Sequence, residues 1–475
     1  MKKVIVFGSF NVLHPGHLRL LRFARELGGH LVVAVLSDRI AGTAAYVHEH
    51  IRLEALQSIT WVDQVIIADE TVTALVERLR PDVVVKGREH EQGANPELAV
   101  LEQYGGRLVF SSGESIFSSL DLIRKEFKEF DSRSISLPHE FLMRHQIKPS
   151  RLVDLLKQFS QLKVCVVGDL IIDEYITCEP LGMSQEDPTI VVTPVDSTRF
   201  IGGAGIVAAH ASGLGATVDF FSVTGNDNAR AYALEGLTVT GVNTRLFADD
   251  SRPTTLKQRY RCKGKSLLRV SHLHQGAIST AIQAEMLKSI ELVMDSIDIM
   301  VFSDFNYGCL PQPLVDQITA IAKRVGVMLV ADSQSSSQVG DISRFRGMDL
   351  ITPTEHEARI STRNREDGLV VLAEQLRRQS SARNVLLKLG QEGLLIHPGD
   401  DRIDGWITDR VQALNASPKD VSGAGDSLMI AGAMTLACGG NIWEAACLGS
   451  LAAAVQVGRV GNTPLRTDEL LRELA

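Results

Sequence analysis

The sequence lacks the features that would direct a protein to a membrane or to nucleic acid. No apolar run is long enough to span a bilayer. The chain carries 49 lysines and arginines against 57 aspartates and glutamates, a formal net charge of −8, so it has no cationic excess for an anionic surface. We therefore expect neither a nucleic-acid partner nor a membrane partner.

The six cysteines contain no CxxC pair. They are scattered over the chain as Cys165, Cys178, Cys262, Cys309, Cys438 and Cys447. This scatter matches neither a disulfide framework nor a zinc site. Buried free thiols are the expected state, and we predict a protein of the reducing cytoplasm.

The sequence does contain two successive series of apolar strands and amphipathic helices. At 475 residues, of which 44% are hydrophobic, the chain is too long for one ordinary core. The strand-like runs of the first series are 2–8, 30–38, 63–69 and 82–87. Helical spacing between them, at 49–59 and 71–80, predicts a parallel α/β sheet with right-handed crossovers.

An aperiodic stretch separates the two series. It runs from 131 to 150 and holds Pro138 and Pro149, so we predict a linker at 131–147. A new strand at 163–175 opens the second series, and short antiparallel strands within 188–200 and 254–272 suggest a small lid. The predicted fold class is α/β, with two doubly wound domains at 1–130 and 148–475.

The stretch GSFNVLHPGH, residues 8–17, follows the first strand. His14 and His17 lie at a loop-to-helix junction, where backbone N–H groups favour anions. When an α-phosphate is attacked and pyrophosphate leaves, two imidazoles can donate hydrogen bonds to the developing charge. We predict nucleotide chemistry with these histidines as catalytic residues. The alternative is a turn with two surface histidines.

This stretch resembles the signature of the nucleotidyltransferase superfamily, which includes cytidylyltransferases and sugar-phosphate adenylyltransferases. VVVKGRE and ESIFSSLDLI resemble later segments of that family. The resemblance implies a Rossmann-like domain with nucleotide-binding residues Gly8, Ser9, Phe10, Lys86, Gly87, Ser118 and Ser119. Arg52 aligns with a family arginine. The loop before it lacks the lysine of close relatives and has only Arg39.

The stretch DVSGAGDS, residues 420–427, precedes an apolar helical run. Gly423, Ala424 and Gly425 at a helix start would offer N–H groups to a transferring γ-phosphoryl group. Asp426 could accept the proton of an attacking sugar hydroxyl, so we predict it as a catalytic base. The alternative is a glycine-rich strand-to-helix turn.

The order of motifs after residue 160 resembles that of ribokinase-like (PfkB) sugar kinases. GDLIIDEY, the GG pair, SDF, LGQEG and DVSGAGD follow one another as in that family. The resemblance implies sugar-binding residues Asp169, Asp173, Gly202, Gly203 and Asp304, and nucleotide-binding residues Gly390, Gly393, Gly423, Ala424 and Gly425. It also implies ATP as substrate and Mg²⁺ held through phosphates and Glu357.

Two segments resemble the heptose-7-phosphate kinases in particular. One is SQEDPTIVV, and the other, TLKQRYRCKGKSLLRV, contains Lys257, Arg259, Lys263 and Arg269. Cations on lid-like strands suit a substrate that already carries a phosphate, although a solvated basic strand is the alternative. Other positions depart from the family: Gly205 or Ile206 replaces an asparagine, Tyr307 a lysine and Thr354 an asparagine, and DSQS at Asp332 replaces DPKG.

The two resemblances together point to the bifunctional heptose-phosphate kinase/adenylyltransferases that make ADP-heptose, here with the domain order reversed. We expect a kinase for a sugar phosphate and a nucleotidyltransferase for a sugar 1-phosphate, in a homodimer formed through the kinase lid. The alternative enzyme acts on another sugar or polyol phosphate, with CTP in place of ATP. A regulatory or scaffold protein with one degenerate site is the alternative from another class.

Overall fold

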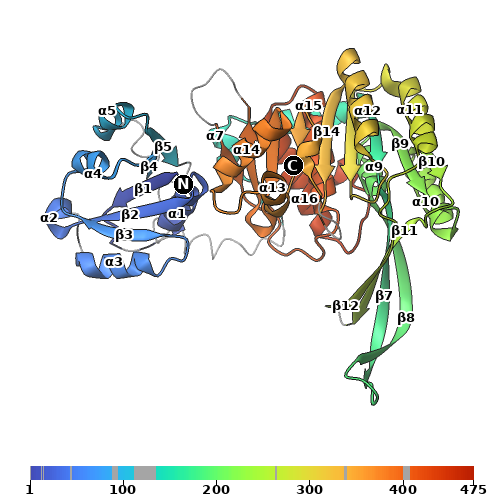
Figure 1. The fold of residues 1–475 in the computed structure, drawn as a ribbon, viewed down its shortest axis with the longest axis horizontal. Helices are drawn as coiled ribbons and strands as arrows, with labels where there is room; N and C mark the ends of the chain where they lie inside the picture. Colours follow the sequence, from blue (N-terminus) through green and yellow to red (C-terminus); the bar gives the residue numbers. More distant parts are fainter. Residues whose placement is uncertain are drawn as a thin grey trace. The chain divides into compact units, whose positions relative to one another are not determined.

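The chain folds into two compact units, described here from a computed structural model. The model describes residues 2–11, 13, 15–42, 45, 47–87, 95–111, 135–262, 265–335, 340–399 and 407–474. The N-terminal unit comprises Met1–Ser132 with Thr362–Gln375, and the C-terminal unit comprises Arg133–Ser361 with Leu376–Ala475 (Figure 1).

A five-stranded parallel sheet forms the centre of the N-terminal unit. Its strands are β1 (Lys3–Gly8), β2 (His30–Leu36), β3 (Gln64–Ala68), β4 (Val83–Gly87) and β5 (Arg107–Ser111), in the order β3-β2-β1-β4-β5. The central strands β1, β2 and β4 are mostly buried, as expected for a parallel sheet with two covered faces, whereas the edge strands β3 and β5 are half-buried. The order reverses at β1, and ligands of such sheets bind where the order reverses.

Short helices connect these strands. They are α1 (Pro15–Glu26), α2 (Asp38–Ala41), α3 (Glu49–Gln57), α4 (Val72–Leu79) and α5 (Glu97–Glu102). Helix α1 follows the GSF turn at the end of β1, so the predicted histidine segment lies at the point where the strand order reverses.

A nine-stranded sheet forms the centre of the C-terminal unit. Its order is β10-β9-β6-β13-β14-β15-β16-β17-β18, and it is parallel up to β16. The strands are β6 (Lys163–Gly168), β9 (Thr217–Thr224), β10 (Asn243–Ala248), β13 (Ile299–Asp304), β14 (Met328–Ser333), β15 (Leu350–Ile351), β16 (Asn384–Lys388), β17 (Leu394–Pro398) and β18 (Asp409–Val411).

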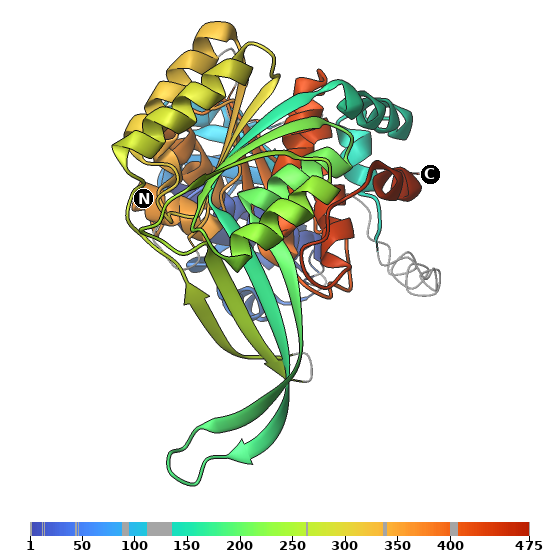
Figure 2. The ribbon, with the colours of Figure 1, turned by 90° about the vertical axis from the view of Figure 1, so that its right-hand side faces the viewer.

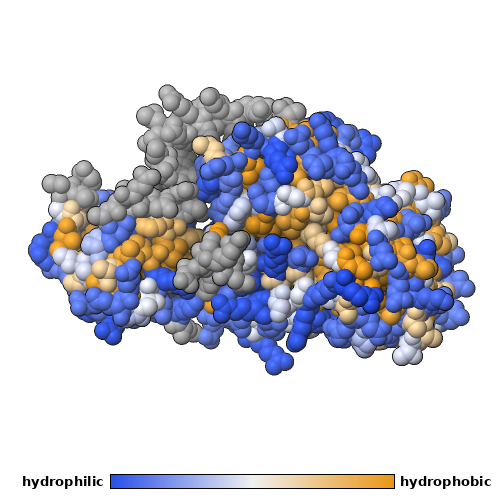
Figure 3. All heavy atoms as spheres, turned by 90° about the horizontal axis from the view of Figure 1, so that it is seen from above, coloured by the Kyte–Doolittle hydropathy of each residue, from blue (hydrophilic) through white to orange (hydrophobic). Residues whose placement is uncertain are grey.

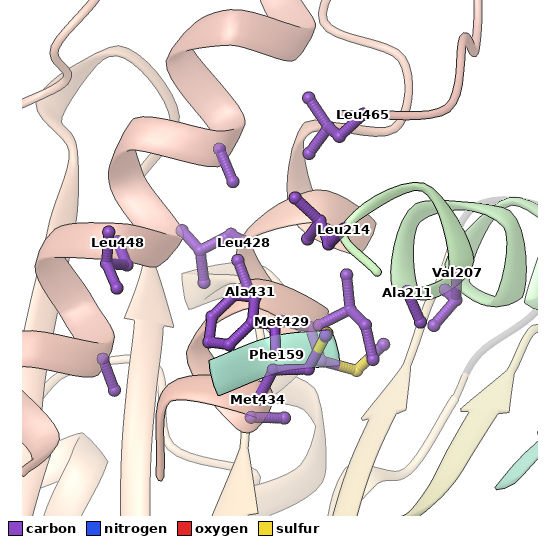
Figure 4. Close-up of a cluster of buried hydrophobic side chains, with 14 of the residues drawn as sticks. Phe159, Val207, Ala211, Leu214, Leu428, Met429, Ala431, Met434, Leu448 and Leu465 are labelled. Atoms are coloured by element: carbon purple, nitrogen blue, oxygen red, sulfur yellow. The ribbon is translucent and has the colours of Figure 1, made fainter. Parts of the chain in front are cut away.

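The helices of the C-terminal unit are α8 (Pro149–Gln158), α9 (Ala204–Gly213), α10 (Asn228–Val239), α11 (Thr280–Met294), α12 (Gln312–Val325), α13 (Glu355–Thr362), α15 (Ala424–Ala437), α16 (Ile442–Val457) and α17 (Thr467–Leu474), while α14 (Leu369–Ser380) begins in the segment 362–375 of the N-terminal unit. Apolar residues of α8, α9, α10, α15, α16 and α17 form the main core with the sheet. Helices α9, α15 and α16 are apolar on all sides because they are buried on nearly all sides. Figure 4 shows Phe159, Met429 and Met434 among this core.

A separate four-stranded sheet, the lid, extends from the C-terminal unit (Figure 2). Its strands are β7 (Leu170–Met183), β8 (Ile190–Gly203), β11 (Thr255–Cys262) and β12 (Lys265–His272), in the order β12-β11-β7-β8. The expected lid is present, but β7 and β8 are 14 residues long and not short. The expected single strand at 163–175 is broken at Asp169, because β6 belongs to the large sheet and β7 to the lid.

The described part of the predicted linker, residues 135–147, packs on the C-terminal unit. Helix α7 (His139–Arg144) buries Phe141 and Leu142 in the main core. Arg144 and His145 both bind Asp409, at 3.0 and 2.7 Å, and His145 stacks on Trp443 with ring centroids 4.1 Å apart. These contacts join the segment to the kinase-like unit.

The face seen in Figure 3 shows hydrophilic residues interspersed with hydrophobic patches. Over the described ranges, none of the helices combines the length and the apolar character needed to cross a bilayer.

Candidate active sites

The start of α15 lies in the candidate site of the C-terminal unit. Gly423, at the N-cap, has a left-handed backbone with φ of 74°, which glycine adopts without strain. Ala424, Gly425 and Asp426 follow in the first helical turn. Because the N–H groups of a first turn have no partner within the helix, this turn can bind an anion.

Asp426 is buried, and its surroundings suit a proton acceptor. Gln334 donates from Nε2 to Oδ1 of Asp426 over 3.0 Å. Burial and the nearby charge of Asp332 raise the pKa of Asp426 to about 7, while Lys388 opposes this rise. A carboxylate with a pKa near neutrality can take up and release a proton under physiological conditions.

A buried ion pair lies beside this turn. Nζ of Lys388, the last residue of β16, donates to both carboxylate oxygens of Asp332, at 2.9 and 3.0 Å. A Cβ atom added to Gly425 would lie 3.1 Å from the Lys388 ammonium. Lys388 was not among the residues predicted from the sequence. The available signal was a lysine that ends an apolar strand-like run directly before the LGQEG motif.

Glu357 caps the start of α13 reciprocally with Thr354. The Thr354 N–H donates to Oε2 of Glu357 over 2.7 Å, and the Glu357 N–H donates to Oγ1 of Thr354 over 3.3 Å. Oε1 of Glu357 accepts from the Ser335 N–H. Threonine therefore satisfies this helix start without the family's asparagine. Within the described ranges no three His, Cys, Asp or Glu side chains form a metal-binding group, and Glu357 as a magnesium ligand stays a prediction.

Gly390 and Gly393 bound a tight turn after β16, η5 (Gly390–Glu392). Their φ angles are 60° and 92°. A Cβ atom at Gly393 would lie 2.1 Å from the carbonyl oxygen of Val411, so only glycine fits there. Their contact with a nucleotide stays a prediction.

Asp173 lies where the lid meets the core. The Arg259 guanidinium is 3.5 Å from its Oδ1 and also donates to Oγ of Ser422, in the loop before α15. Burial raises the pKa of Asp173 in spite of Arg259 and Lys257. A Cβ atom at Gly202 would lie 2.4 Å from Oδ2 of Asp173, so glycine there leaves room for the carboxylate. Gly203, with φ of 58°, is the N-cap of α9.

Asp169 and Asp304 lie under the loop 305–309. Asp169 accepts the backbone N–H groups of Phe305, Tyr307 and Cys309, and burial and the charge of Asp304 raise its pKa to about 6. Asp304 accepts from Ser333 and pairs with Arg344 at 2.9 Å. In this structure both carboxylates shape the loop, and their binding of sugar hydroxyls stays a prediction.

The lid carries the predicted cations on adjacent strands. Lys257 lies over the rings of Phe305 and Tyr307, 5.3 and 5.1 Å from their centroids. Arg259 pairs in register with Arg269, which is exposed on β12. Tyr307, which replaces the family's lysine, is thus next to a lysine from the lid.

In the N-terminal unit, the turn after β1 is built around Phe10. Phe10 is buried with φ of 49°, and its ring meets His17 edge-on, with centroids 5.0 Å apart. A Cβ atom at Gly8 would lie 3.2 Å from the Phe10 ring. The turn therefore holds His17 at the start of α1, as the anion-binding prediction requires.

Arg52 is buried and holds three segments together. It donates to the carbonyl oxygens of Ser9, Leu36 and Val47, and its Nη2 pairs with Asp38. Arg39, the cation of the loop without lysine, pairs with Asp69 at 3.0 Å.

Lys86, at the end of β4, is also paired. Its Nζ donates to Oδ1 of Asn95 over 2.6 Å and to Oε1 of the buried Glu97 over 2.7 Å. A contact of Lys86 or Gly87 with a nucleotide stays a prediction. Four predicted residues lie outside the described residues: His14, Ser118, Ser119 and Lys263.

Comparison with known families decides the classification of the chain. The model of the pfkB family carbohydrate kinases matches residues 161–468. The chain belongs to this family. A cytidylyltransferase-like model matches residues 5–111. Both resemblances drawn from the sequence are confirmed, and so is the predicted α/β class with two doubly wound sheets.

Curated relatives of this pfkB family member include three named Bifunctional protein HldE. That of Desulfatibacillum aliphaticivorans is 32% identical over 321 residues, 66% of this chain and 64% of the relative. Those of Paramagnetospirillum magneticum and Helicobacter hepaticus are 29% and 31% identical, over 68% and 65% of this chain and 65% and 63% of theirs. The matches thus span less than two thirds of each relative.

Solved structures support the fold of the kinase family. The carbohydrate kinase from Agrobacterium tumefaciens matches with a TM-score of 0.52 and 20% identity, over 66% of this chain and 97% of that one. Arabidopsis thaliana ribokinase, complexed with ribose and ATP, matches with a TM-score of 0.51 and 19% identity, over 66% and 98%. At these identities the matches show a ribokinase-like fold.

Proposed function

We propose that the C-terminal unit transfers the γ-phosphoryl group of ATP to a sugar phosphate that resembles heptose 7-phosphate. The observation that carries this proposal is the buried Asp426, with a pKa near 7, in the first turn of α15 next to the Gly423–Gly425 backbone. A proton acceptor and an anion-binding turn are the two parts that phosphoryl transfer to an alcohol requires.

In this mechanism Asp426 takes the proton of the attacking hydroxyl. The hydroxyl oxygen forms a bond to the γ-phosphorus, and the bond between that phosphorus and the β–γ bridging oxygen breaks, so ADP leaves with the electron pair. The N–H groups of the turn stabilise the charge on the transferring oxygens. Gln334 orients Asp426 through its hydrogen bond to Oδ1.

The sugar end of the substrate lies beside Asp173, at the base of the lid, in this proposal. Asp173 accepts sugar hydroxyls, and Arg259 orients it while also bonding Ser422 in the loop before α15. Lys257, Arg259 and Arg269 would bind the phosphate that the substrate already carries, because cationic donors on rigid strands suit phosphate oxygens. Asp169 and Asp304 support the pocket through the loop 305–309.

We propose that a magnesium ion binds together with ATP near α15. The carboxylates of Asp332, Glu357 and Asp426 lie within electrostatic reach of a single buried lysine, Lys388, and oxygen ligands are those that Mg²⁺ prefers. Glu357 and the phosphates would hold the ion, which would neutralise phosphate charge.

The N-terminal unit, in our proposal, transfers a nucleotidyl group to a sugar 1-phosphate. His14 and His17 stabilise the charge on the α-phosphate, and the turn at Gly8, Ser9 and Phe10 holds the nucleotide. With ATP the product is ADP-heptose or a similar nucleotide sugar. The similarity to proteins named Bifunctional protein HldE supports joining the two activities in one chain.

Two further statements belong to this proposal. The enzyme is a homodimer through the lid, whose strands β7, β8 and β12 expose apolar residues: Leu181, Met183, Ile190, Val195 and Leu268. It works in the cytoplasm, in agreement with six free cysteine thiols, all within the described ranges.

Product analysis by mass spectrometry tests the proposal. The full chain is incubated with ATP or CTP and a panel of phosphorylated sugars. From sugar phosphates that resemble heptose 7-phosphate we expect ADP and a doubly phosphorylated sugar. From sugar 1-phosphates we expect pyrophosphate and a nucleotide sugar. The second candidate function is a cytidylyltransferase that acts on another sugar or polyol phosphate, and the cytidylyltransferase-like match supports it. Such an enzyme would turn over CTP. Absence of both transfers would contradict an enzymatic role.

A further inference from the structure

The Lys388–Asp332 pair has an unusual position for a buried ion pair. Parallel strands β14 and β16 both end at the carboxyl edge of the sheet, where ligands of such sheets bind. Asp332 precedes the end of β14 by one residue, and Lys388 ends β16. Their side chains are only 2% and 11% exposed, yet they lie beside the first turn of α15.

A contribution to the free energy of folding does not explain why this pair is buried. A buried ion pair contributes little net free energy, because the desolvation of two charges offsets their attraction. The local charge is also unbalanced, since Asp332, Asp426 and Glu357 all act electrostatically on Lys388. This site therefore carries more negative than positive charge. We infer that it binds a further cation or that the pair acts on a charged ligand.

The ammonium of Lys388 has a donor to spare for such a ligand. An ammonium has three N–H groups, and the two carboxylate oxygens of Asp332 account for two hydrogen bonds. Burial lowers the pKa of Lys388, but the charge of Asp332 and the neighbouring carboxylates outweigh it and raise that pKa, so the lysine stays charged. Asp332 fixes the ammonium next to Gly425, in the turn that would bind the γ-phosphoryl group.

We propose that Lys388 is a further catalytic residue of phosphoryl transfer, which donates its third N–H group to an oxygen of the transferring γ-phosphoryl. This inference rests on the kinase function proposed above. Lys388 keeps its proton throughout: Asp426 takes the proton of the sugar hydroxyl, and ADP leaves with the electrons of the broken P–O bond. Asp332 is a positioning residue, because it acts by holding Lys388.

Charge-neutral variants of the full chain test this role. Lys388→Met removes the donor with similar side-chain volume, and Asp332→Asn together with Lys388→Met removes both charges. The double variant leaves no unpaired buried carboxylate at this position, so it should fold even where Lys388→Met alone does not. Lys288→Met, on the exposed face of α11, is the matched control. Thermal unfolding and the dissociation constant of ATP are measured for each protein.

We expect kcat for ADP formation to fall about 10²–10³-fold in Lys388→Met, with the dissociation constant of ATP changed less than about threefold, as for loss of one preorganised donor. The double variant should be equally slow. If the double variant recovers the kcat of the wild type, Lys388 serves only to neutralise Asp332 and the proposal is overturned.

The outcomes separate this proposal from the proposed function. A wild-type chain that transfers phosphoryl groups, with Lys388→Met at the same kcat, would overturn the role of Lys388 and leave the kinase function standing. A wild-type chain without any phosphoryl transfer would overturn the kinase function, and the role of Lys388 with it.

Discussion

The guanidinium of Arg52 donates a hydrogen bond to the carbonyl oxygen of Ser9, 43 residues earlier in the chain. The same side chain also bonds the carbonyls of Leu36 and Val47, so one buried cation fixes the turn after β1 and the end of β2. In the sequence, Arg52 aligns with an arginine of the nucleotidyltransferase superfamily. The structure shows that Arg52 fixes the turn for which we propose nucleotide chemistry.

Substitution of Arg52 by lysine should destabilise the N-terminal unit. Lysine cannot reach the carbonyls of Ser9, Leu36 and Val47 together, and each buried acceptor left without a donor costs about 1–3 kcal/mol. We expect a loss of about 3 kcal/mol in the free energy of unfolding, measured by urea denaturation. Arg39→Lys, on an exposed pair with Asp69, is the control and should be neutral. Equal stability of both variants would contradict this role.

Loss of the histidines should slow nucleotidyl transfer through kcat. His14→Ala and His17→Ala each remove a donor aimed at the developing charge, which costs about 10²–10³-fold in rate. Pyrophosphate release with saturating sugar 1-phosphate measures this effect, and ADP formation by the other unit is the internal control. A rise in KM alone would mean that the histidines bind ground-state nucleotide.

Phosphoryl transfer should depend on the ionisation of Asp426. Its pKa of about 7 means that the base is protonated, and inactive, in more acidic solution. We expect kcat/KM for ADP formation to rise about tenfold per pH unit below pH 7 and to level off above it. Asp426→Asn should reduce kcat by about 10²–10⁴-fold with nucleotidyl transfer intact. A kcat/KM that does not change in slope near pH 7 would indicate another catalytic base.

The same carboxylate should make the C-terminal unit less stable as the pH rises. The folded pKa lies above the unfolded value of 3.8, so the folded state holds a proton that the unfolded state releases between about pH 4 and pH 7. The contribution of Asp426 to the free energy of unfolding is therefore fully present below pH 4. It is lost as the pH rises through 7. Asp426→Asn should melt at a higher temperature than the wild type at pH 8, with the difference vanishing near pH 4.

A methyl group at Gly202 should impair sugar binding. The added Cβ atom would lie 2.4 Å from Oδ2 of Asp173 and displace that carboxylate. We expect Gly202→Ala to raise KM for the sugar phosphate with little change in ATP affinity. Gly432→Ala, inside α15, is the control, because its Cβ atom would meet its neighbours at 3.5 Å or more. An unchanged KM would remove Asp173 from the sugar site.

The segment 135–147 should stabilise the kinase unit. Phe141 is 2% exposed in the main core, so Phe141→Ala should cost about 3–5 kcal/mol in the free energy of unfolding. Met143→Ala, on the same helix with a side chain that is 79% exposed, is the control. A fragment 133–475 should also melt at a higher temperature than a fragment 148–475. Equal melting temperatures would place the domain boundary at 148, as the sequence alone predicts.

Local patterns in the sequence predicted four of the five strands in the N-terminal sheet. Strands β1 to β4 follow apolar runs bounded by glycine and aspartate, and those signals are local, whereas β5 (Arg107–Ser111) was not predicted. The break at Asp169 was missed because GDLIIDEY is apolar on both sides of it. Only the bonds of Asp169 to the distant loop 305–309 show why the chain leaves one sheet for another.

The site was predictable only where a residue lies within a motif. Asp426 and Gly423 follow from DVSGAGDS. Lys388 does not follow from a motif, because its importance depends on Asp332, 56 residues earlier, on β14, which β15 separates from β16 in the sheet. Pairings of this kind depend on strand order, and a single sequence does not reveal which strands are neighbours.

The bonds around Asp169 have a mechanical consequence for the lid. At this one residue the backbone bonds Ser303 and Ala204, while the side chain bonds three amides of the loop 305–309. The end of the lid at Asp169, where β7 begins, is therefore held rigidly against the core. Farther out, the pairing of β7 with β8 shifts register between Thr177 and Cys178 and again between Pro180 and Gly182. Bending should concentrate in this outer part, so that the tip can flex while Asp173, near the core, stays aligned with the first turn of α15.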